Sequence, residues 1–240
     1  MIEKSDILDK IGLNGLIDFI YPPVCLCCDG FLDNGRLPVC PDCFEKIAQI
    51  ELPFCINCRQ FLEKSVICRD CGELAMAVFC LGHFTDNLQK MIHQFKYHGF
   101  KRLGANLAVR LADKFLPALT KLKADVIVPV PLHSIREKSR GFNQAAILAD
   151  IIGKRIDVPV ATETLLKQKR TKDQAKLNPE QRRENIKDAF RLPGSEVAGK
   201  RIIIVDDVVT TGATVNEAAL TLRRAGGIPV AVCAIAAAGF

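Results

Sequence analysis

The stretch IIIVDDVVTTGAT, residues 202–214, is the most informative part of the chain. Its four apolar residues, Ile202–Val205, have the composition of a short buried strand in a parallel sheet. Asp206 and Asp207 follow where we expect that strand to end, and TTGAT opens the next helix. In an open α/β sheet, ligands bind beyond the carboxyl ends of the strands, and N–H groups at a helix start attract anions. A carboxylate pair beside such a helix start suits a phosphorylated sugar.

These thirteen residues resemble the phosphoribosyl pyrophosphate (PRPP) signature of the type I phosphoribosyltransferases. The resemblance implies that Asp206 and Asp207 hold the ribose 2′- and 3′-hydroxyls as the catalytic pair. It also implies a loop that binds the 5′-phosphate, made of Thr210, Thr211, Gly212, Ala213 and Thr214. The simpler alternative is a strand, turn and helix whose aspartates only cap the helix. The chain contains neither Gly-x-Gly-x-x-Gly nor Gly-x-x-x-x-Gly-Lys-Thr, which argues against dinucleotide-binding and P-loop proteins.

Eight of the eleven cysteines form four Cys-x-x-Cys knuckles within 47 residues, separated by gaps of 11, 11 and 9 residues. Two knuckles complete one tetrahedral zinc site, so the spacing predicts two structural zinc ions with protein ligands only. Sequential pairing of the knuckles is the simplest arrangement, and a cross-braced pairing also fits the spacing. We expect Cys27 to be a bystander, and Cys80 and Cys233 to be buried thiols. The predicted zinc ligands are Cys25, Cys28, Cys40, Cys43, Cys55, Cys58, Cys68 and Cys71.

We expect three regions: an N-terminal amphipathic helix and linker (1–24), a double zinc ribbon (25–72) and a phosphoribosyltransferase-like domain (73–240). Residues 73–240 contain 26 Lys/Arg and 16 Asp/Glu, a net charge of +10, so this region carries the charge that attracts anions. No apolar run approaches the roughly twenty residues of a membrane span, and the N-terminus is a poor secretory signal. We therefore expect a cytoplasmic protein.

Strand-like and helix-like patterns alternate from residue 73 onward. This alternation predicts an α/β fold, a mostly parallel sheet with helices on both faces, preceded by the small zinc-ribbon module. The expected strands are 75–83, 125–130, 164–167, 201–205 and 228–236, and the expected helices are 86–97, 102–122, 142–155 and 211–225.

A second motif, PVPLH followed by RGFNQ, lies in residues 129–144. It resembles the ComF family (ComFC and GntX-type proteins), and the resemblance covers nearly the whole chain, including the PPVCLCC entry into the ribbons. The resemblance implies a loop after this strand that binds pyrophosphate, with His133 and Arg140 as candidate ligands. Asn143 and Gln144 either bind pyrophosphate oxygens or cap the following helix.

A basic segment, LKQKRTKDQAKLNPEQRRENIKDAF, occupies residues 166–190. Its counterpart in the family is a flexible loop that closes over the substrate, so Lys169 and Arg170 are candidate substrate ligands. Such a loop could exclude water and neutralise a departing pyrophosphate; the alternative is a solvated charged helix. Lys96, at the end of a predicted helix, is a further candidate phosphate ligand.

We carry two classes of function forward. In the first, the chain is a phosphoribosyltransferase-like enzyme that binds PRPP, or a related phosphorylated ribose, with Mg²⁺; no acceptor pocket or general base can be assigned. In the second, implied by the family's link to competence and DNA uptake, the chain binds single-stranded DNA or DNA-processing proteins without transferase activity. The chain has no Trp and two Tyr, which argues against an extensive base-stacking platform. A scaffold whose zinc module binds a partner protein is a third possibility.

Overall fold

The computed structural model describes residues 22–32, 37–63, 65–72, 75–169, 179–194 and 196–239. The predicted N-terminal helix lies almost wholly outside the described residues, and so does the predicted ligand Arg170. No helix in the described part of the chain is long and apolar enough to cross a membrane.

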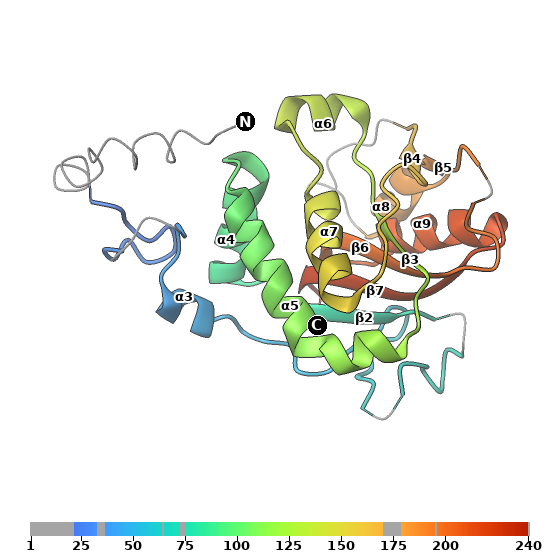
Figure 1. Cartoon of the computed structure of the whole chain (residues 1–240), viewed down its shortest axis with the longest axis horizontal. Coiled ribbons are helices and arrows are strands. Elements are labelled where there is room, and N and C mark those ends of the chain that lie inside the picture. Colours follow the sequence, from blue (N-terminus) through green and yellow to red (C-terminus); the bar gives the residue numbers. More distant parts are fainter. Residues whose placement is uncertain are drawn as a thin grey trace.

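A five-stranded sheet forms the centre of the molecule (Figure 1). Its strands are β1 (Phe54–Cys55), β2 (Ala77–His83), β3 (Val126–Pro129), β6 (Arg201–Val209) and β7 (Ile228–Ala237). They lie in the order β1-β2-β7-β6-β3. The last four run parallel, and only the two-residue β1 pairs antiparallel, with β2. The prediction of a mostly parallel α/β sheet is confirmed.

Helices cover both faces of this sheet, as Figure 1 shows. The helices on one face are α4 (Asp86–Tyr97), α5 (Lys101–Lys121) and α7 (Gln144–Ile156), and those on the other are α8 (Pro179–Ile186) and α9 (Ala213–Arg224). Successive side chains of a strand point to opposite faces. Ile203 and Val205 of β6 therefore join the core under α5 and α7, whereas Ile202 and Ile204 join the core under α9. Burial on both faces explains why β6 has a continuous apolar run.

The strand that carries the two aspartates is longer than expected. β6 does not end at Val205 but continues through both aspartates to Val209, because β7 pairs with it along this whole length. The next helix, α9, accordingly begins at Ala213, two residues later than predicted. The two carboxylates thus belong to the last paired positions of the sheet rather than to a loop, which fixes their directions.

The segment after β3, expected to be a loop, contains the helix α6 (Ser134–Arg140). Nδ1 of His133 accepts the Ile135 N–H at 3.3 Å and caps its start, while Gly141, with φ of 80°, ends it in the left-handed conformation. A two-stranded hairpin of β4 (Leu166–Lys167) and β5 (Phe190–Arg191) lies outside the main sheet.

Two cysteine-rich ribbons precede this domain. The first contains the short helix α3 (Pro41–Glu45) and packs against α4, where Nζ of Lys90 donates to the Cys27 carbonyl at 2.8 Å. The second contributes β1, so it is joined to the edge of the central sheet through β2. Figure 1 shows the first ribbon beside α4 and the second below β2.

Candidate functional site

The end of β6 places the two aspartates on opposite sides of the sheet. By the alternation along the strand, Asp207 points toward the face covered by α4, α5 and α7, and Asp206 points toward the face covered by α9. Lys96, near the end of α4, pairs with Asp207, with 2.8 Å between Nζ and Oδ1. The N–H of Asp207 donates to Oδ1 of Asp206 at 2.8 Å. This arrangement orients both carboxylates at the carboxyl end of the sheet.

Burial shifts the pKa values of Asp206 and of Lys167 toward neutral pH. Burial, and then repulsion from Asp207, raises the pKa of Asp206 to about 7, against the attraction of Lys96 and Lys167. Burial lowers the pKa of Lys167, on β4, to about 8, while Asp206 acts in the opposite direction. Groups with such displaced pKa values gather at functional sites. The start of the basic segment therefore meets β6 at the point where Lys167 faces Asp206.

The predicted phosphate loop makes a sharp turn between β6 and α9. Gly212 has a left-handed φ of 78° and is the N-cap of α9. Oγ1 of Thr211 accepts the N–H of Ala213 at 3.4 Å. The first N–H groups of a helix have no partner within the helix, so an anion placed here can accept hydrogen bonds from them. The loop therefore ends at a helix start, a place where anions bind in other proteins.

The second zinc ribbon lies directly on this loop, which the sequence reasoning missed. The Arg59 guanidinium donates to the Thr210 carbonyl. The Ile56 side chain packs on Gly212, since a Cβ added to this glycine would lie 2.9 Å from Cδ1 of Ile56. Two residues of a zinc knuckle thus hold a loop that lies about 150 residues further along the chain.

The residues predicted to bind pyrophosphate come from α4, α6 and α7. The Arg140 guanidinium lies 5.0 Å from the centre of the Tyr97 ring, next to Lys96 in sequence. Its NH1 donates to Oε1 of Gln144 at 2.6 Å. His133 pairs with Lys167 in an isolated parallel bridge, which places it beside the Asp206 side of the site. Lys96 therefore contacts Asp207 directly, whereas Arg140 neighbours Tyr97 and His133 neighbours Lys167.

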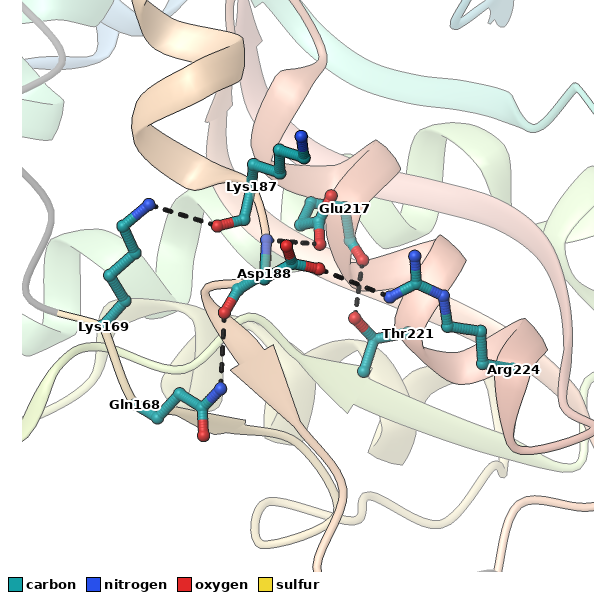
Figure 2. A network of polar contacts seen from close by, with 7 residues as sticks. All are labelled: Gln168, Lys169, Lys187, Asp188, Glu217, Thr221 and Arg224. Carbon is teal, nitrogen blue, oxygen red and sulfur yellow. Dashed lines mark hydrogen bonds and ion pairs between the residues drawn. The ribbon is translucent and has the colours of Figure 1, made fainter.

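Lys169 lies elsewhere, at the end of α8 (Figure 2). Its Nζ donates to the carbonyl oxygens of Lys187 at 3.3 Å and of Glu184 at 3.5 Å. The carboxylate of the neighbouring Asp188 forms an ion pair with Arg224 at 3.6 Å. The backbone N–H of Asp188 donates to Oε1 of Glu217 at 2.9 Å. Figure 2 shows these contacts at the end of α8 and on α9, where backbone carbonyl oxygens hold the ammonium group of Lys169.

The cysteines form two separate clusters that pair the knuckles sequentially. The four sulfur atoms of each cluster lie within 4.8 Å of one another. Zinc–sulfur bonds of about 2.3 Å in a tetrahedron put the sulfurs about 3.8 Å apart. The observed separation is 3.8 Å for Cys28 and Cys40 and 3.5 Å for Cys58 and Cys68, so both donor sets fit zinc. The clusters are Cys25, Cys28, Cys40 and Cys43, and Cys55, Cys58, Cys68 and Cys71.

The three other cysteines lie outside these clusters. Cys80 and Cys233 are fully buried in the sheet, and burial raises the pKa of both thiols, that of Cys233 to about 12. The Cys27 thiol donates to the Asn87 carbonyl at 3.8 Å, and burial raises its pKa to about 11. These thiols are structural, as expected.

Comparisons with known proteins agree with this architecture. A double zinc ribbon domain matches residues 16–72, and a phosphoribosyl transferase domain matches residues 120–239. Together with the two four-cysteine clusters, the first match supports two structural zinc ions.

Three curated relatives match this chain over different lengths. Competence protein F of Haemophilus influenzae is 31% identical over 89% of this chain and 96% of its own length. Competence protein ComFC of Bacillus subtilis is 27% identical over 86% of this chain and 91% of its own length. DNA utilization protein YhgH of Salmonella typhimurium is 38% identical over 62% of this chain and 66% of its own length. The chain therefore belongs to the ComF family of competence proteins, with a double zinc ribbon followed by a phosphoribosyl transferase domain.

Proposed function

We propose that this chain binds PRPP, or a related phosphorylated ribose, at the carboxyl end of β6. The observation that carries the proposal is the junction of the carboxylate pair with the loop Thr210–Thr214, which ends at the start of α9. A ribose with a 5′-phosphate carries hydroxyl groups and an anionic group on the same sugar. One such ligand can therefore contact both the carboxylate pair and the loop. The family match to a phosphoribosyl transferase domain supports the same ligand class.

Each part of the site has a separate task under this proposal. The carboxylates of Asp206 and Asp207 accept hydrogen bonds from the ribose hydroxyls, and the ion pair with Lys96 keeps Asp207 in place. N–H groups of the phosphate loop and of the first turn of α9 donate to the 5′-phosphate. Arg140 supplies positive charge for a pyrophosphate group on the ribose, and His133 supplies a donor through Nε2, because its Nδ1 accepts from Ile135.

Magnesium fits this donor set, because Mg²⁺ is usually held by one or two carboxylates together with substrate phosphates. Asp206 and Asp207 would hold it, directly or through water. Bound Mg²⁺ supplies charge neutralisation for pyrophosphate oxygens. The chain's own residues fix the ribose and direct hydrogen-bond donors at the phosphates. The proposed function is therefore binding of the ligand. Release of pyrophosphate would be measured separately, as the sign of a transfer reaction.

Titration calorimetry with PRPP, with and without Mg²⁺, tests this proposal on protein whose zinc content is measured. We expect saturable binding that Mg²⁺ strengthens. The double variant Asp206→Asn with Asp207→Asn removes two hydrogen bonds to charged groups, about 3 kcal/mol or more, and should weaken binding at least about a hundredfold. The exposed carboxylates Asp113 and Asp150 provide the matched double Asn control. Absence of heat from the wild-type protein at millimolar PRPP would overturn the proposal.

A second candidate function, binding of single-stranded DNA, is favoured by the net charge of +10 on residues 73–240, from 26 Lys/Arg and 16 Asp/Glu. The names of the relatives, competence and DNA utilization proteins, point in the same direction. Contacts to phosphates release counterions, so binding of a labelled oligonucleotide should weaken steeply from 50 to 200 mM salt. Affinity that is independent of salt would count against this function.

A further inference from the structure

We propose that the second zinc ribbon is part of the phosphate-binding site, and that Arg59 is a positioning residue for the phosphate loop. This inference rests on the proposed function and adds to it, because it ties ligand affinity to zinc in one ribbon and not in the other. The first observation is the hydrogen bond from the Arg59 guanidinium to the Thr210 carbonyl, the carbonyl at which the loop leaves β6.

The second observation is the packing of Ile56 against the loop. Ile56 is 2% exposed and lies so close to Gly212 that a Cβ on this residue would come within 2.9 Å of Cδ1 and displace it. Gly212 is also the residue with the left-handed φ of 78° on which the turn depends. The ribbon therefore supports the loop at two points, by Arg59 at its first residue, Thr210, and by Ile56 at its middle residue, Gly212. N–H groups aimed at a phosphate keep their directions only if the loop backbone is held.

The third observation is that the ribbon residues are themselves fixed. The N–H of Ile56 donates to the Met76 carbonyl at 3.0 Å, which continues the pairing of β1 with β2. The Arg59 side chain lies over the Phe54 ring, with 5.3 Å between Cζ and the ring centre. The N–H of Arg59 closes a tight turn onto the Cys55 carbonyl at 3.0 Å.

This turn is the Cys55–Cys58 knuckle, so zinc determines its geometry. Arg59 follows the knuckle directly and has a left-handed φ of 67°, a conformation that non-glycine residues adopt only when the surroundings impose it. Zinc bound by the second cluster would impose it here, because both sulfurs of the knuckle must reach one ion. Zinc in the second ribbon therefore positions Ile56 and Arg59, and through them the phosphate loop.

Two measurements on the zinc-loaded full chain test this inference with Arg59→Ala, Arg59→Lys and Asp29→Ala. Asp29 occupies the corresponding place in the first ribbon, after the Cys25–Cys28 knuckle and with a left-handed φ of 59°, so it controls for the backbone effect. The first measurement is amide hydrogen exchange of residues 206–216 in the unliganded protein. The second is calorimetry with ribose 5-phosphate, which carries the 5′-phosphate and lacks pyrophosphate.

We expect Arg59→Ala to keep both zinc ions, to speed exchange in residues 206–216 and to weaken ribose 5-phosphate binding about tenfold. Arg59→Lys retains a donor and should restore part of both effects, whereas Asp29→Ala should match the wild type. Unchanged exchange and affinity in Arg59→Ala would overturn the inference while leaving the proposed function intact. A wild-type protein that binds neither ribose 5-phosphate nor PRPP would instead overturn the proposed function, and with it this inference.

Discussion

The two zinc ribbons share a pattern of backbone hydrogen bonds but contact different parts of the molecule. Residues 23–32 and 53–62 both follow the pattern Pro-x-Cys-x-x-Cys-x-x-Phe-Leu, at a spacing of 30 residues. Their hydrogen bonds coincide: the N–H of the first cysteine donates to the carbonyl five residues later, that of Gly30 at 2.7 Å in one ribbon and that of Gln60 at 2.9 Å in the other. A bridge joins Val24 to Phe31 in the first ribbon, and an equivalent bridge joins Phe54 to Phe61 in the second.

What differs is the element that each ribbon touches. The first ribbon lies on α4, where Asn87 and Lys90 donate to its carbonyl oxygens, and the far end of the same helix carries Lys96, the partner of Asp207. The second ribbon lies on the phosphate loop itself, through Ile56 and Arg59. Repeated modules of the same fold can therefore carry different tasks, set by one or two side chains. The predictions below test this difference.

Among the variants that compare the two ribbons, the removal of zinc ligands in matched positions has the largest expected effect. Cys55→Ser with Cys58→Ser should lose one zinc ion, release the phosphate loop and weaken PRPP binding about thirtyfold or more, or about 2 kcal/mol. Cys25→Ser with Cys28→Ser should also lose one zinc ion but keep affinity within about threefold. Zinc content and calorimetry on the same samples check both. Equal losses of affinity in the two variants would remove the distinction between the ribbons.

A steric change at the contact between ribbon and loop should cost somewhat less. Gly212→Ala combines a left-handed backbone, about 1–2 kcal/mol for a residue with a Cβ, with the collision against Ile56. Urea unfolding should show a loss of about 2 kcal/mol. Adding Ile56→Ala should relieve the collision and leave the backbone strain. Gly30→Ala in the first ribbon, where Gln60 shows that a side chain is tolerated, is the control; a loss equal to that of Gly212→Ala would contradict the account.

Variants of two lysines on α4 distinguish the effect of the first ribbon on ligand affinity from the effect of the site residue itself. Lys96→Met removes the partner of Asp207 and should weaken PRPP binding about tenfold, with less than about 1 kcal/mol change in unfolding free energy because the pair is partly exposed. Lys90→Met breaks the contact with the Cys27 carbonyl, and we expect little effect on affinity. Calorimetry distinguishes the two; a larger loss for Lys90→Met would show that the first ribbon controls the site.

The smallest effect concerns pH in the unliganded protein. Burial raises the pKa of Asp206 from 3.8 to about 7, so the folded state retains a proton that the unfolded state has released. Stability contributed by the protonated group is therefore present below the unfolded pKa and is lost as pH rises through about 7. Urea unfolding between pH 6 and 8 should show the wild type losing stability relative to Asp206→Asn. A constant difference between the two proteins would mean that Asp206 is ionised throughout this range.

Much of the fold followed from local sequence. The predicted helix 86–97 coincides with α4, because its apolar residues recur at helical spacing and its cap precedes Asp86. The end of β6 was misjudged because paired aspartates suggest a strand end, whereas pairing with β7 extends the strand to Val209. The sequence contains signals for α6, since His133 caps its start and Gly141 ends it, although we expected a loop there.

The site was predictable only in part. Motif and spacing identify the aspartates, the predicted phosphate loop and the zinc ligands. Lys167, in contrast, becomes a candidate site residue only because β4 brings it to Asp206. Arg59 and Ile56 contact residues about 150 positions away, which no local pattern specifies. The repeat at a spacing of 30 residues was a usable signal, since it shows Arg59 replacing Asp29 at an otherwise equivalent turn.

The most direct test of the account is amide hydrogen exchange of the wild-type, zinc-loaded chain with and without ribose 5-phosphate. The account predicts that the ligand slows exchange in residues 206–216 and also in residues 54–62 of the second ribbon, while residues 24–32 of the first ribbon stay unchanged. Equal changes in the two ribbons, or none in either, would contradict the claim that the second ribbon alone belongs to the phosphate site.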